Sequence, residues 1–504
     1  MIQTRIYNWA KVDPAKPALI WNSISLNYLS FSNMIEATRQ QLERERPSTF
    51  GTVVVLGRNL LSVWINVIAL RSLGFITVSA DSLDQAAALQ LEDIVWVVTA
   101  VGEGFPEEDV AKGLNGSTSV FARVKHTRSL PPAPELDHLI AVAGDLSAQG
   151  GHILFTSGTT GRYKKVLMAG KNDDDINPTK LAGLVTIDEN SVYYGGFFPL
   201  YTAAGYGLPL LVWNAGGCVV LEQPLTFENL FKLNTSFTVM IPFHLRALVN
   251  KLQRTKAYSR GHFALMTGGS FVPLELADRI RELLTDDLII AYGSTECSAG
   301  MVMSSKYRSS EDLYWFTPAA DRVVQVVNQY GEECAVGEEG DVRVLLKETD
   351  CHGYLDDPKS SAAMFRDGYF YPGDMAIRRA DGNIRIIGRV ADVVNFEGFK
   401  LAVGPLEQAI RDALEVDEVC AFSAVTKKGQ DELLIAIQAR DRKLDADLQE
   451  RVREIVLAHG SKAVSSKLIR LFLFPRFPRE ETGMRKTKRA VLRQKMLAEI
   501  DAMA

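Results

Sequence analysis

The sequence contains 504 residues, which is too many for one hydrophobic core, so we expect roughly two to four structural units. Hydrophobic residues make up 47% of the chain and charged residues 23%, a composition typical of soluble globular proteins. The 56 basic and 61 acidic side chains give a net charge of −5, which excludes an overall basic field for binding nucleic acid or an anionic membrane.

The cysteines and the N-terminus bear on the cellular compartment. Five cysteines are scattered without any C-x-x-C pair, which indicates neither a zinc site nor a disulfide framework and favours a reducing compartment. The start of the chain lacks a charged segment followed by an apolar one, so no signal peptide is expected. The most apolar stretch, residues 53–78, is interrupted by Arg58 and Arg71, so we expect no membrane span there. The cytoplasm is therefore the expected location.

Strand and helix patterns alternate through the first part of the chain. Residues 52–56 form a continuous β-branched and aliphatic run, typical of a buried parallel strand, and the apolar positions after it follow one helix stripe. Further apolar strands are expected at 152–158 and 286–296, each ending in polar residues. This alternation predicts parallel α/β layers.

The pattern changes after about residue 336, where short strand-like runs are separated by turns rich in glycine and aspartate. After Arg389 a compact block follows that is able to form a small α+β domain of its own. Its expected elements are a helix at 405–414, strands at 418–425 and 433–437, a helix at 445–458 and a strand at 468–474.

The densest motif is T-S-G-T-T-G, followed closely by two lysines. It comprises Thr156, Ser157, Gly158, Thr159, Thr160 and Gly161, with Lys164 and Lys165 after it. Glycines let backbone N–H groups approach a phosphate closely, hydroxyls donate hydrogen bonds, and ammonium groups balance charge. The spacing does not fit a Walker loop. Composition alone leaves a phosphate-binding loop and a polar surface turn as alternatives.

A second motif, A-Y-G-S-T-E, occupies residues 291–296 and ends the segment 286–296, directly after its apolar strand. Polar groups at the carboxyl end of such a strand lie where open α/β sheets usually bind ligands. Tyr292 is suited to stack on a base, and Glu296 is suited to hold Mg²⁺ through its carboxylate oxygens. An ordinary strand-end turn with a core tyrosine is the alternative.

A third motif pairs Gly373-Asp374 with Gly388-Arg389. An acidic residue after a tight turn is able to accept hydrogen bonds from both ribose hydroxyls, and a nearby arginine is able to reach ribose or phosphate. Each dipeptide alone is a common turn.

In this order and at these spacings, the three motifs resemble the adenylate-forming superfamily of acyl- and aryl-CoA synthetases, stand-alone adenylation domains and firefly luciferase. The resemblance covers residues 10–495, and the Gly268-Gly269-Ser270 element before the second motif also fits it. It implies an α/β fold: a large N-terminal domain of stacked α/β subdomains, residues 1–389, and a small mobile α+β C-terminal domain, residues 390–504.

The resemblance also implies roles for individual residues. The loop at 156–165 is expected to bind the ATP phosphates, with Gly269, Ser270 and Gly293 lining the nucleotide site. Tyr292 is expected to stack on adenine, Thr295 to contact the α-phosphate, and Glu296 to bind Mg²⁺. Asp374 and Arg389 are expected to hold the ribose.

Two positions depart from the family pattern in the C-terminal part. The catalytic lysine of the family lies in a signature ending T-G-K-x-x-R, but Met484 follows the glycine here. Aligning Lys486 with that lysine requires two inserted residues, and Lys488 is the reserve candidate. The hinge position, usually Asp or Lys, is Ala391. A solvated basic tail, or one that touches nucleic acid, is the alternative interpretation of this segment.

The resemblance places the acid-binding pocket around Tyr201, Thr202, Ala203 and Gly268. Adenylation domains for α-amino acids typically carry Phe-Asp at the positions of Thr202 and Ala203, and the aspartate pairs with the α-ammonium group. Ala203 supplies no charge, so an acid without an α-amine is favoured, because an unpaired buried ammonium is costly. The small residues after Ala203 either leave room for a ring or a medium acyl group or serve helix packing.

The leading hypothesis is therefore an acid–thiol ligase that uses ATP, Mg²⁺ and coenzyme A. One alternative is a stand-alone adenylation enzyme that loads its acid onto the phosphopantetheine of a carrier protein. An alternative of another class is a non-catalytic binding module on the same scaffold. No nucleic-acid partner and no membrane span are expected.

Overall fold

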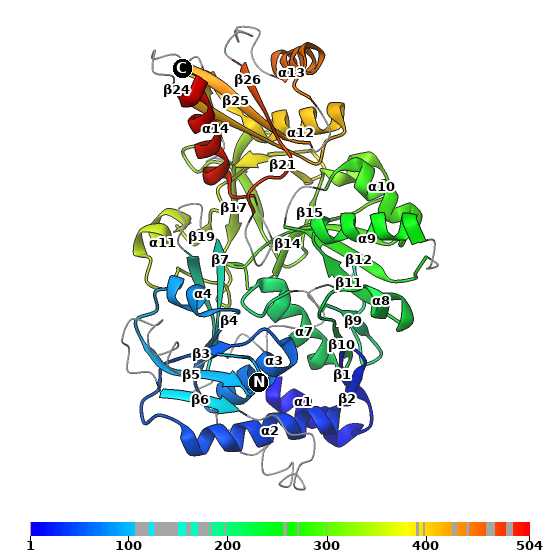
Figure 1. The fold of residues 1–504 in the computed structure, drawn as a ribbon, viewed down its shortest axis with the longest axis vertical. Coiled ribbons are helices and arrows are strands. Elements are labelled where there is room, and N and C mark those ends of the chain that lie inside the picture. Colours follow the sequence, from blue (N-terminus) through cyan, green and yellow to red (C-terminus); the bar gives the residue numbers. More distant parts are fainter. Residues whose placement is uncertain are drawn as a thin grey trace. The chain divides into compact units, whose positions relative to one another are not determined.

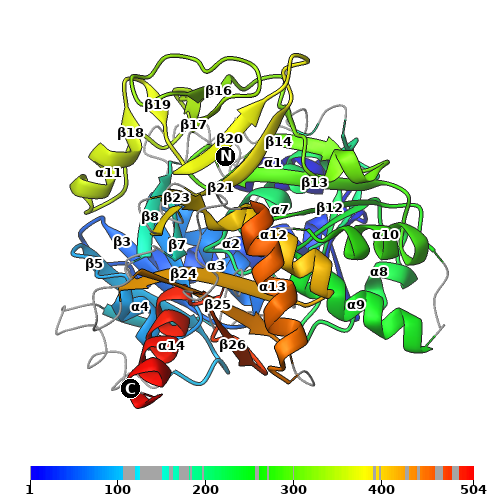
Figure 2. The same ribbon diagram turned by 90° about the horizontal axis from the view of Figure 1, so that it is seen from above.

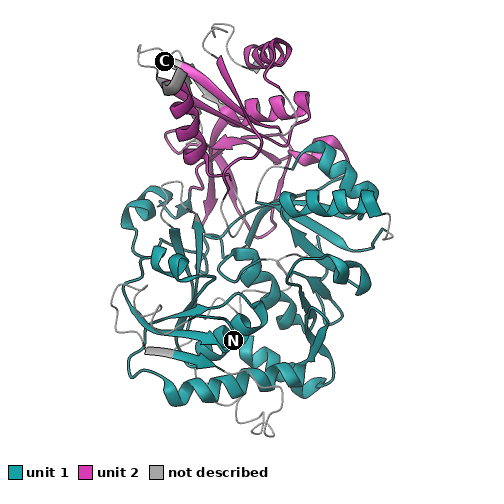
Figure 3. Ribbon diagram, in the orientation of Figure 1, with its two compact units in different colours: residues 1–308, 346–370 teal, residues 309–345, 371–504 magenta. Residues whose placement is uncertain are grey.

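The computed structural model describes most of the chain (Figure 1), seen from above in Figure 2. The described residues are 2–105, 120–124, 150–157, 163–169, 181, 184–195, 198–255, 260–269, 272–298, 300–389, 393–396, 399–425, 431–439, 443–459, 469–479 and 487–503. The chain divides into two compact units, one of residues 1–308 with 346–370 and the other of residues 309–345 with 371–504 (Figure 3).

The first unit contains a doubly wound sheet with the strand order β6-β5-β3-β4-β7-β8. Its strands are parallel except for β8, which runs antiparallel to β7. Their bounds are β3 (Thr52–Leu56), β4 (Ile76–Ala80), β5 (Ile94–Ala100), β6 (Val120–Val124), β7 (His152–Ser157) and β8 (Tyr163–Met168). Strand β3 is buried along its whole length, as expected for a central parallel strand.

A second sheet of this unit has the order β14-β13-β12-β11-β9-β10-β1-β2 and is parallel from β13 to β1. The bounds are β1 (Pro17–Trp21), β2 (Ile24–Asn27), β9 (Val192–Tyr194), β10 (Cys218–Leu221), β11 (Phe237–Met240), β12 (Ala264–Gly268), β13 (Leu288–Ser294) and β14 (Gly300–Lys306). One hydrophobic cluster packs between the two sheets and their helices, and it includes the aromatic rings of Phe31, Trp64, Tyr206 and Trp213.

The helices of the first unit are α1 (Ile2–Val12), α2 (Tyr28–Glu45), α3 (Leu60–Ser72), α4 (Leu83–Ala88), α7 (Ala203–Ala215), α8 (Glu228–Lys232), α9 (Pro242–Thr255), α10 (Leu274–Leu283) and α11 (Pro358–Met364). The short strands β18 (Phe365–Arg366) and β19 (Tyr369–Phe370) follow α11. Among the described residues, no helix combines the length and the hydropathy that crossing a membrane requires.

The second unit begins with a 3-10 turn (Ser310–Leu313), β15 (Thr317–Pro318) and an antiparallel set of strands. These strands are β16 (Val324–Val327), β17 (Glu339–Leu345), β20 (Asp374–Arg378) and β21 (Ile384–Arg389). A hairpin of β22 (Val393–Phe396) and β23 (Phe399–Ala402) follows.

The last part of this unit is a sheet of β24 (Glu418–Val425), β25 (Asp431–Gln438) and β26 (Ile469–Phe474) with helices on both faces (Figure 2). Helices α12 (Val403–Leu414) and α13 (Ala446–His459) pack on one face, and α14 (Arg489–Met503) packs on the other. Residues alternate between the two faces along β24 and β25, as the pleat of a strand requires.

The structure confirms the predicted α/β fold class and, within a few residues at the ends, each of the predicted strands and helices. It adds α14 and the hairpin of β22 and β23, which the sequence analysis did not predict. The domain boundary between residues 389 and 390 stays a prediction.

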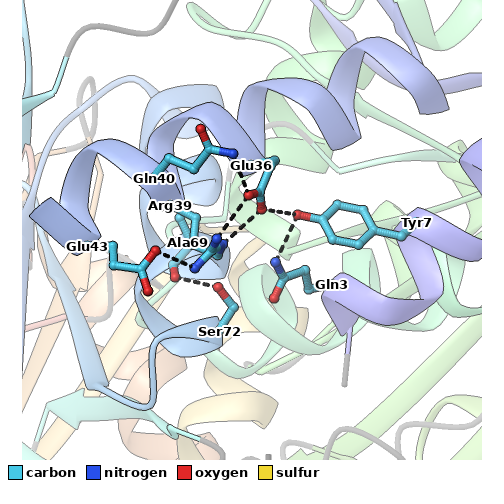
Figure 4. Close-up of polar contacts among 8 residues, drawn as sticks. All are labelled: Gln3, Tyr7, Glu36, Arg39, Gln40, Glu43, Ala69 and Ser72. Carbon is cyan, nitrogen blue, oxygen red and sulfur yellow. Dashed lines mark hydrogen bonds and ion pairs between the residues drawn. The ribbon is translucent and has the colours of Figure 1, made fainter. Parts of the chain in front are cut away.

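A buried polar network joins α1 to α2 in the first unit (Figure 4). The carboxylate of Glu36 accepts a hydrogen bond from the Tyr7 hydroxyl at 3.1 Å and from Gln40 at 2.9 Å. Arg39 forms a two-pronged pair with the same carboxylate at 2.8 and 3.0 Å. Burial, together with the charge of Glu36, raises the pKa of Tyr7. The Tyr7 hydroxyl therefore stays protonated and acts as a hydrogen-bond donor to Glu36. The network therefore compensates the buried charge of Glu36.

We expect Arg39→Met to lower the free energy of unfolding by about 3 kcal/mol, because it leaves a buried carboxylate without its cation. Glu43→Gln is the matched control, since it removes the exposed partner that Arg39 contacts at 3.0 Å. The control is expected to change the free energy by less than about 0.5 kcal/mol. Urea unfolding of the full-length variants measures both values, and equal losses would contradict this account.

Candidate functional site

The T-S-G-T-T-G motif begins in β7, and the two lysines after it lie in β8. The two strands pair with Thr156 opposite Lys164 and Ser157 opposite Tyr163, so the motif joins a strand to a strand, whereas a Walker loop joins a strand to a helix. The remaining predicted loop residues, Gly158, Thr159, Thr160 and Gly161, lie outside the described residues, as does the side chain of Ser157.

The two lysines of this motif have different environments because neighbouring side chains in a strand point to opposite faces. Lys165 is buried, and its ammonium group donates hydrogen bonds to the carbonyls of Leu89 and Gln90 at 3.0 and 3.2 Å. It also forms an ion pair with Asp356 at 2.9 Å. The ammonium group of Lys164 lies 4.9 Å from the centre of the Tyr354 ring. Lys165 is therefore committed to the fold, and Lys164 remains the candidate phosphate ligand.

Strands β12 and β13 bring two predicted elements together. They are parallel neighbours, with Gly268 beside Ala291. A Cβ on Gly268 would lie 2.2 Å from the Ala291 carbonyl oxygen, so the close approach of the strands requires glycine. Gly269 has φ +77°, a conformation that favours glycine. Ser270 lies outside the described residues.

Glu296 lies two residues beyond the end of β13. Tyr292 and Gly293 belong to the last part of this strand, and Thr295 directly follows it. Its side chain is only 8% exposed, and each carboxylate oxygen accepts a hydrogen bond. Oε1 accepts from the Tyr354 hydroxyl at 2.6 Å, and Oε2 accepts from the Ser294 hydroxyl. Burial, together with the charge of Glu296, raises the pKa of Tyr354, so this phenol keeps its proton. The result is a buried carboxylate fixed from both sides.

This arrangement fits a magnesium ion that shares its ligands with a nucleotide. The part of the chain that the structure describes has no group of three or more His, Cys, Asp or Glu side chains suited to hold a metal alone. Mg²⁺ usually binds through one or two carboxylates together with phosphate oxygens and water. Glu296 supplies one such oriented carboxylate.

Asp374 and Arg389 also lie together, in the second unit. They face each other as paired residues of β20 and β21, and Nε of Arg389 lies 3.1 Å from Oδ1 of Asp374. Gly373 precedes them with φ +76°, which confirms the predicted tight turn. The structure thus brings together the two residues predicted to hold a ribose.

The residues predicted to form the acid pocket take clear structural positions. Thr202 is the N-cap of α7, and its hydroxyl accepts the N–H of Gly205 at 3.1 Å. Tyr201 is buried, stacks on Phe155 with ring centres 4.5 Å apart, and donates its hydroxyl to Asp81 at 3.1 Å. Gly205 has no room for a side chain, because a Cβ would lie 2.1 Å from the Pro199 carbonyl oxygen. Helix packing therefore accounts for one of the small residues, while the acid-binding roles of Tyr201, Thr202, Ala203 and Gly268 stay predictions.

The C-terminal signature is described only in part, because Lys486, Met484 and the hinge residue Ala391 lie outside the described residues. Thr487 pairs with Arg479 in a β-bridge, and the N–H of Lys488 donates to the Pro478 carbonyl at 2.8 Å. Arg489 forms an ion pair with the buried Glu407 at 2.8 Å. These contacts anchor the chain on the C-terminal side of Lys486.

A family model described as AMP-binding enzyme matches residues 6–345. The chain belongs to the AMP-binding enzyme family. This match also confirms the resemblance to adenylate-forming enzymes.

Two relatives illustrate how far this chain has diverged from characterised sequences, since both are less than 30% identical to it. A (7a-methyl-1,5-dioxo-octahydro-1H-inden-4-yl)propanoyl:CoA ligase of Mycobacterium tuberculosis is 28% identical over 340 residues, covering 66% of this chain and 61% of the relative. A salicyl-AMP ligase/salicyl-S-ArCP synthetase of the same organism is 26% identical over 338 residues, covering 62% of this chain and 58% of the relative. The chain thus spans about three fifths of the length of these relatives.

Solved structures establish the fold over nearly the whole chain. The o-succinylbenzoate coenzyme A synthetase of Bacillus subtilis, solved in complex with ATP and a magnesium ion, superposes with a TM-score of 0.76 at 16% identity. The superposition covers 97% of this chain and 99% of that one. The fold is therefore that of adenylate-forming enzymes, with a separate C-terminal domain.

The structure places one further residue, Tyr354, beside Glu296, and no sequence motif predicts it. Tyr354 contacts Glu296, although 58 residues separate them in the chain. Local spacing carries no sign of such a contact.

We expect Lys165→Met to lower the free energy of unfolding by about 2 kcal/mol, because it removes the donor to the buried Leu89 carbonyl. Lys306→Met is the matched control, since Lys306 forms an ion pair of the same length, 2.9 Å, with Asp287 but is exposed. The control is expected to change the free energy by less than about 0.5 kcal/mol. Urea unfolding of both variants checks this, and a neutral Lys165→Met would show that Lys165 is not required by the fold.

Proposed function

We propose that this chain activates a carboxylic acid with ATP and Mg²⁺ to form an acyl-adenylate and pyrophosphate. The thiol of coenzyme A then forms a bond to the acyl carbon, the bond from that carbon to AMP breaks, and AMP and the thiol proton are released. The observation that carries the proposal is the buried Glu296 carboxylate, fixed by two hydroxyls at the carboxyl end of β13. Such a group in a ligand-binding position of an α/β sheet suits a nucleotide-bound magnesium ion.

The first unit supplies the groups for adenylation. Tyr292 stacks on adenine, Thr295 contacts the α-phosphate, and Lys164 with the loop at 156–165 binds the phosphates. One oxygen of the substrate carboxylate forms a bond to the α-phosphorus, and the bond from that phosphorus to pyrophosphate breaks. A carboxylate is already ionised at neutral pH, so this step requires no general base. Glu296 would hold the magnesium ion, which would supply positive charge where negative charge gathers on the phosphates.

The second unit supplies the ribose contacts and the mobile groups. Asp374 and Arg389 hold the ribose hydroxyls, supported by their pairing across β20 and β21. Residues 390–504 form a small domain that rotates about Ala391 between the two half-reactions. In adenylation this domain brings Lys486 to the carboxylate and the α-phosphate, where an ammonium group stabilises developing charge.

The substrate is an aryl or medium acyl acid without an α-amine. Helix α7 begins at Ala203 and has no acidic residue in its first turn, so this turn offers no carboxylate to pair with an α-ammonium group. Burying an ammonium group without such a partner is unfavourable by several kcal/mol.

Coenzyme A is the proposed acceptor, supported by the name of the first relative reported above, a CoA ligase. The name of the second relative includes a salicyl-S-ArCP synthetase, which supports the phosphopantetheine of a carrier protein as the second candidate. All five cysteines are free thiols, which supports a reducing location such as the cytoplasm.

Pyrophosphate release against a panel of acids tests the proposal. Aryl and medium acyl acids are expected to support turnover, their α-amino counterparts far less, and coenzyme A is expected to appear in a thioester product. Glu296→Gln is expected to lose at least about a hundredfold in rate, because an amide is a weaker magnesium ligand. No release with any acid would favour a non-catalytic binding module, and a thioester formed only on a carrier protein would favour the second candidate.

Separate half-reactions test the catalytic lysine. Lys486→Ala is expected to slow adenylation roughly a hundred- to thousandfold, because it removes a charge-assisted contact in a closed site. Thioester formation from pre-made acyl-adenylate is expected to be largely spared, because the rotated domain carries the lysine away. Lys488→Ala is the matched control. A selective loss in Lys488→Ala alone would transfer the role to Lys488, and equal losses in both half-reactions would indicate a docking or folding defect.

A further inference from the structure

The segment of residues 349–356 forms hydrogen bonds both to strand β8, which follows the glycine-rich motif, and to the chain around Glu296. At its start, the Ser298 hydroxyl donates to the Thr349 carbonyl at 2.8 Å, and the Cys351 N–H donates to the Glu296 carbonyl at 2.9 Å. At its end, the Leu355 N–H donates to the backbone carbonyl of the β8 residue Lys165 at 3.0 Å. The segment is therefore tied by backbone hydrogen bonds to both functional elements.

Tyr354 lies between these two attachments and contacts a candidate functional side chain on each side. Its hydroxyl donates to Oε1 of Glu296 at 2.6 Å, and its ring faces the ammonium group of Lys164 at 4.9 Å. The side chain is 6% exposed, and the ring packs edge-on against Phe365. A phenol held in this way has little freedom to turn.

We propose that Tyr354 is a positioning residue that aims the Glu296 carboxylate at the metal and holds Lys164 near the phosphates. The proposal rests on the magnesium-binding role of Glu296 proposed above. A carboxylate oxygen has two lone pairs, so Oε1 is able to accept the Tyr354 hydrogen bond and still bind a cation. The hydrogen bond to one lone pair of Oε1 fixes the orientation of the carboxylate, and with it the direction of the second lone pair.

The ion pair of Lys165 with Asp356 also attaches this segment to strand β8. It ties the chain two residues after Tyr354 to strand β8, one residue from Lys164. Adjacent residues of one strand thus serve two purposes, because Lys165 anchors the segment and Lys164 contacts the ring that the segment carries.

The experiment measures metal binding directly. Mn²⁺ is titrated into the full-length chain with a non-hydrolysable ATP analogue and followed by electron paramagnetic resonance. Tyr354→Phe keeps the ring and removes only the hydroxyl. We expect its Mn²⁺ affinity to fall about tenfold to a hundredfold, the range typical when a hydrogen bond to a metal ligand is removed.

Tyr307→Phe is the matched control. The Tyr307 hydroxyl also donates to a carboxylate, Oδ1 of Asp278, at 2.6 Å, and its ring also faces a cation, Arg281, at 5.7 Å. The side chain is similarly buried, at 2% exposure. Its Mn²⁺ affinity is expected to equal that of the wild type, even where its melting temperature falls as far as that of Tyr354→Phe.

Glu296→Gln and the double variant complete the test. If Tyr354 acts through Glu296, adding Tyr354→Phe to Glu296→Gln weakens Mn²⁺ binding little further. Wild-type affinity in Tyr354→Phe alone, or a full further loss in the double variant, would overturn the positioning role. Wild-type affinity in Glu296→Gln would overturn the metal assignment of the proposed function, and the positioning role with it.

Discussion

The arrangement of the candidate site depends on one constraint, namely that a buried carboxylate must have its charge met by partners. Glu296 meets this requirement with hydroxyl donors on both oxygens, from Ser294 within its own turn and from Tyr354 far along the chain. Hydroxyl donors satisfy the oxygens without neutralising the charge. The Glu296 carboxylate is thus oriented by neutral donors, whereas Glu36 in the same unit pairs with the guanidinium group of Arg39 and serves only the fold.

The backbone that carries Glu296 depends on a second constraint, which is the spacing of parallel strands. Strands β12 and β13 approach so closely that Gly268 leaves no room for a side chain beside Ala291. Gly268 therefore has a packing reason in addition to its predicted role in the acid pocket. It lies at the carboxyl end of β12, where open α/β folds usually bind ligands.

Sequence patterns predicted those parts of the fold and site that local rules determine. The strand at 52–56 follows from a local apolar run. The turn motifs predict that Arg389 is near Asp374, but their pairing across β20 and β21 comes from the structure. The contact of Tyr354 with Glu296 depends on how distant segments pack, and no local spacing records it. The different environments of Lys164 and Lys165 depend on the face to which each strand position points, which requires knowing what covers each face.

The hydrogen-bond donors of Glu296 and the ion-pair partner of Asp374 differ in solvent exposure. This difference suits the proposed tasks of the two carboxylates. Arg389 is about half exposed, so its ion pair with Asp374 contributes little to stability and suits exchange for the ribose of the proposed complex. The donors to Glu296 are buried or partly buried, so the proposed metal ligand is already oriented in this structure. A metal ligand requires accurate direction, while a ribose acceptor has to exchange one partner for another. The structure thus combines a rigid carboxylate in the first unit with an exchangeable one in the second.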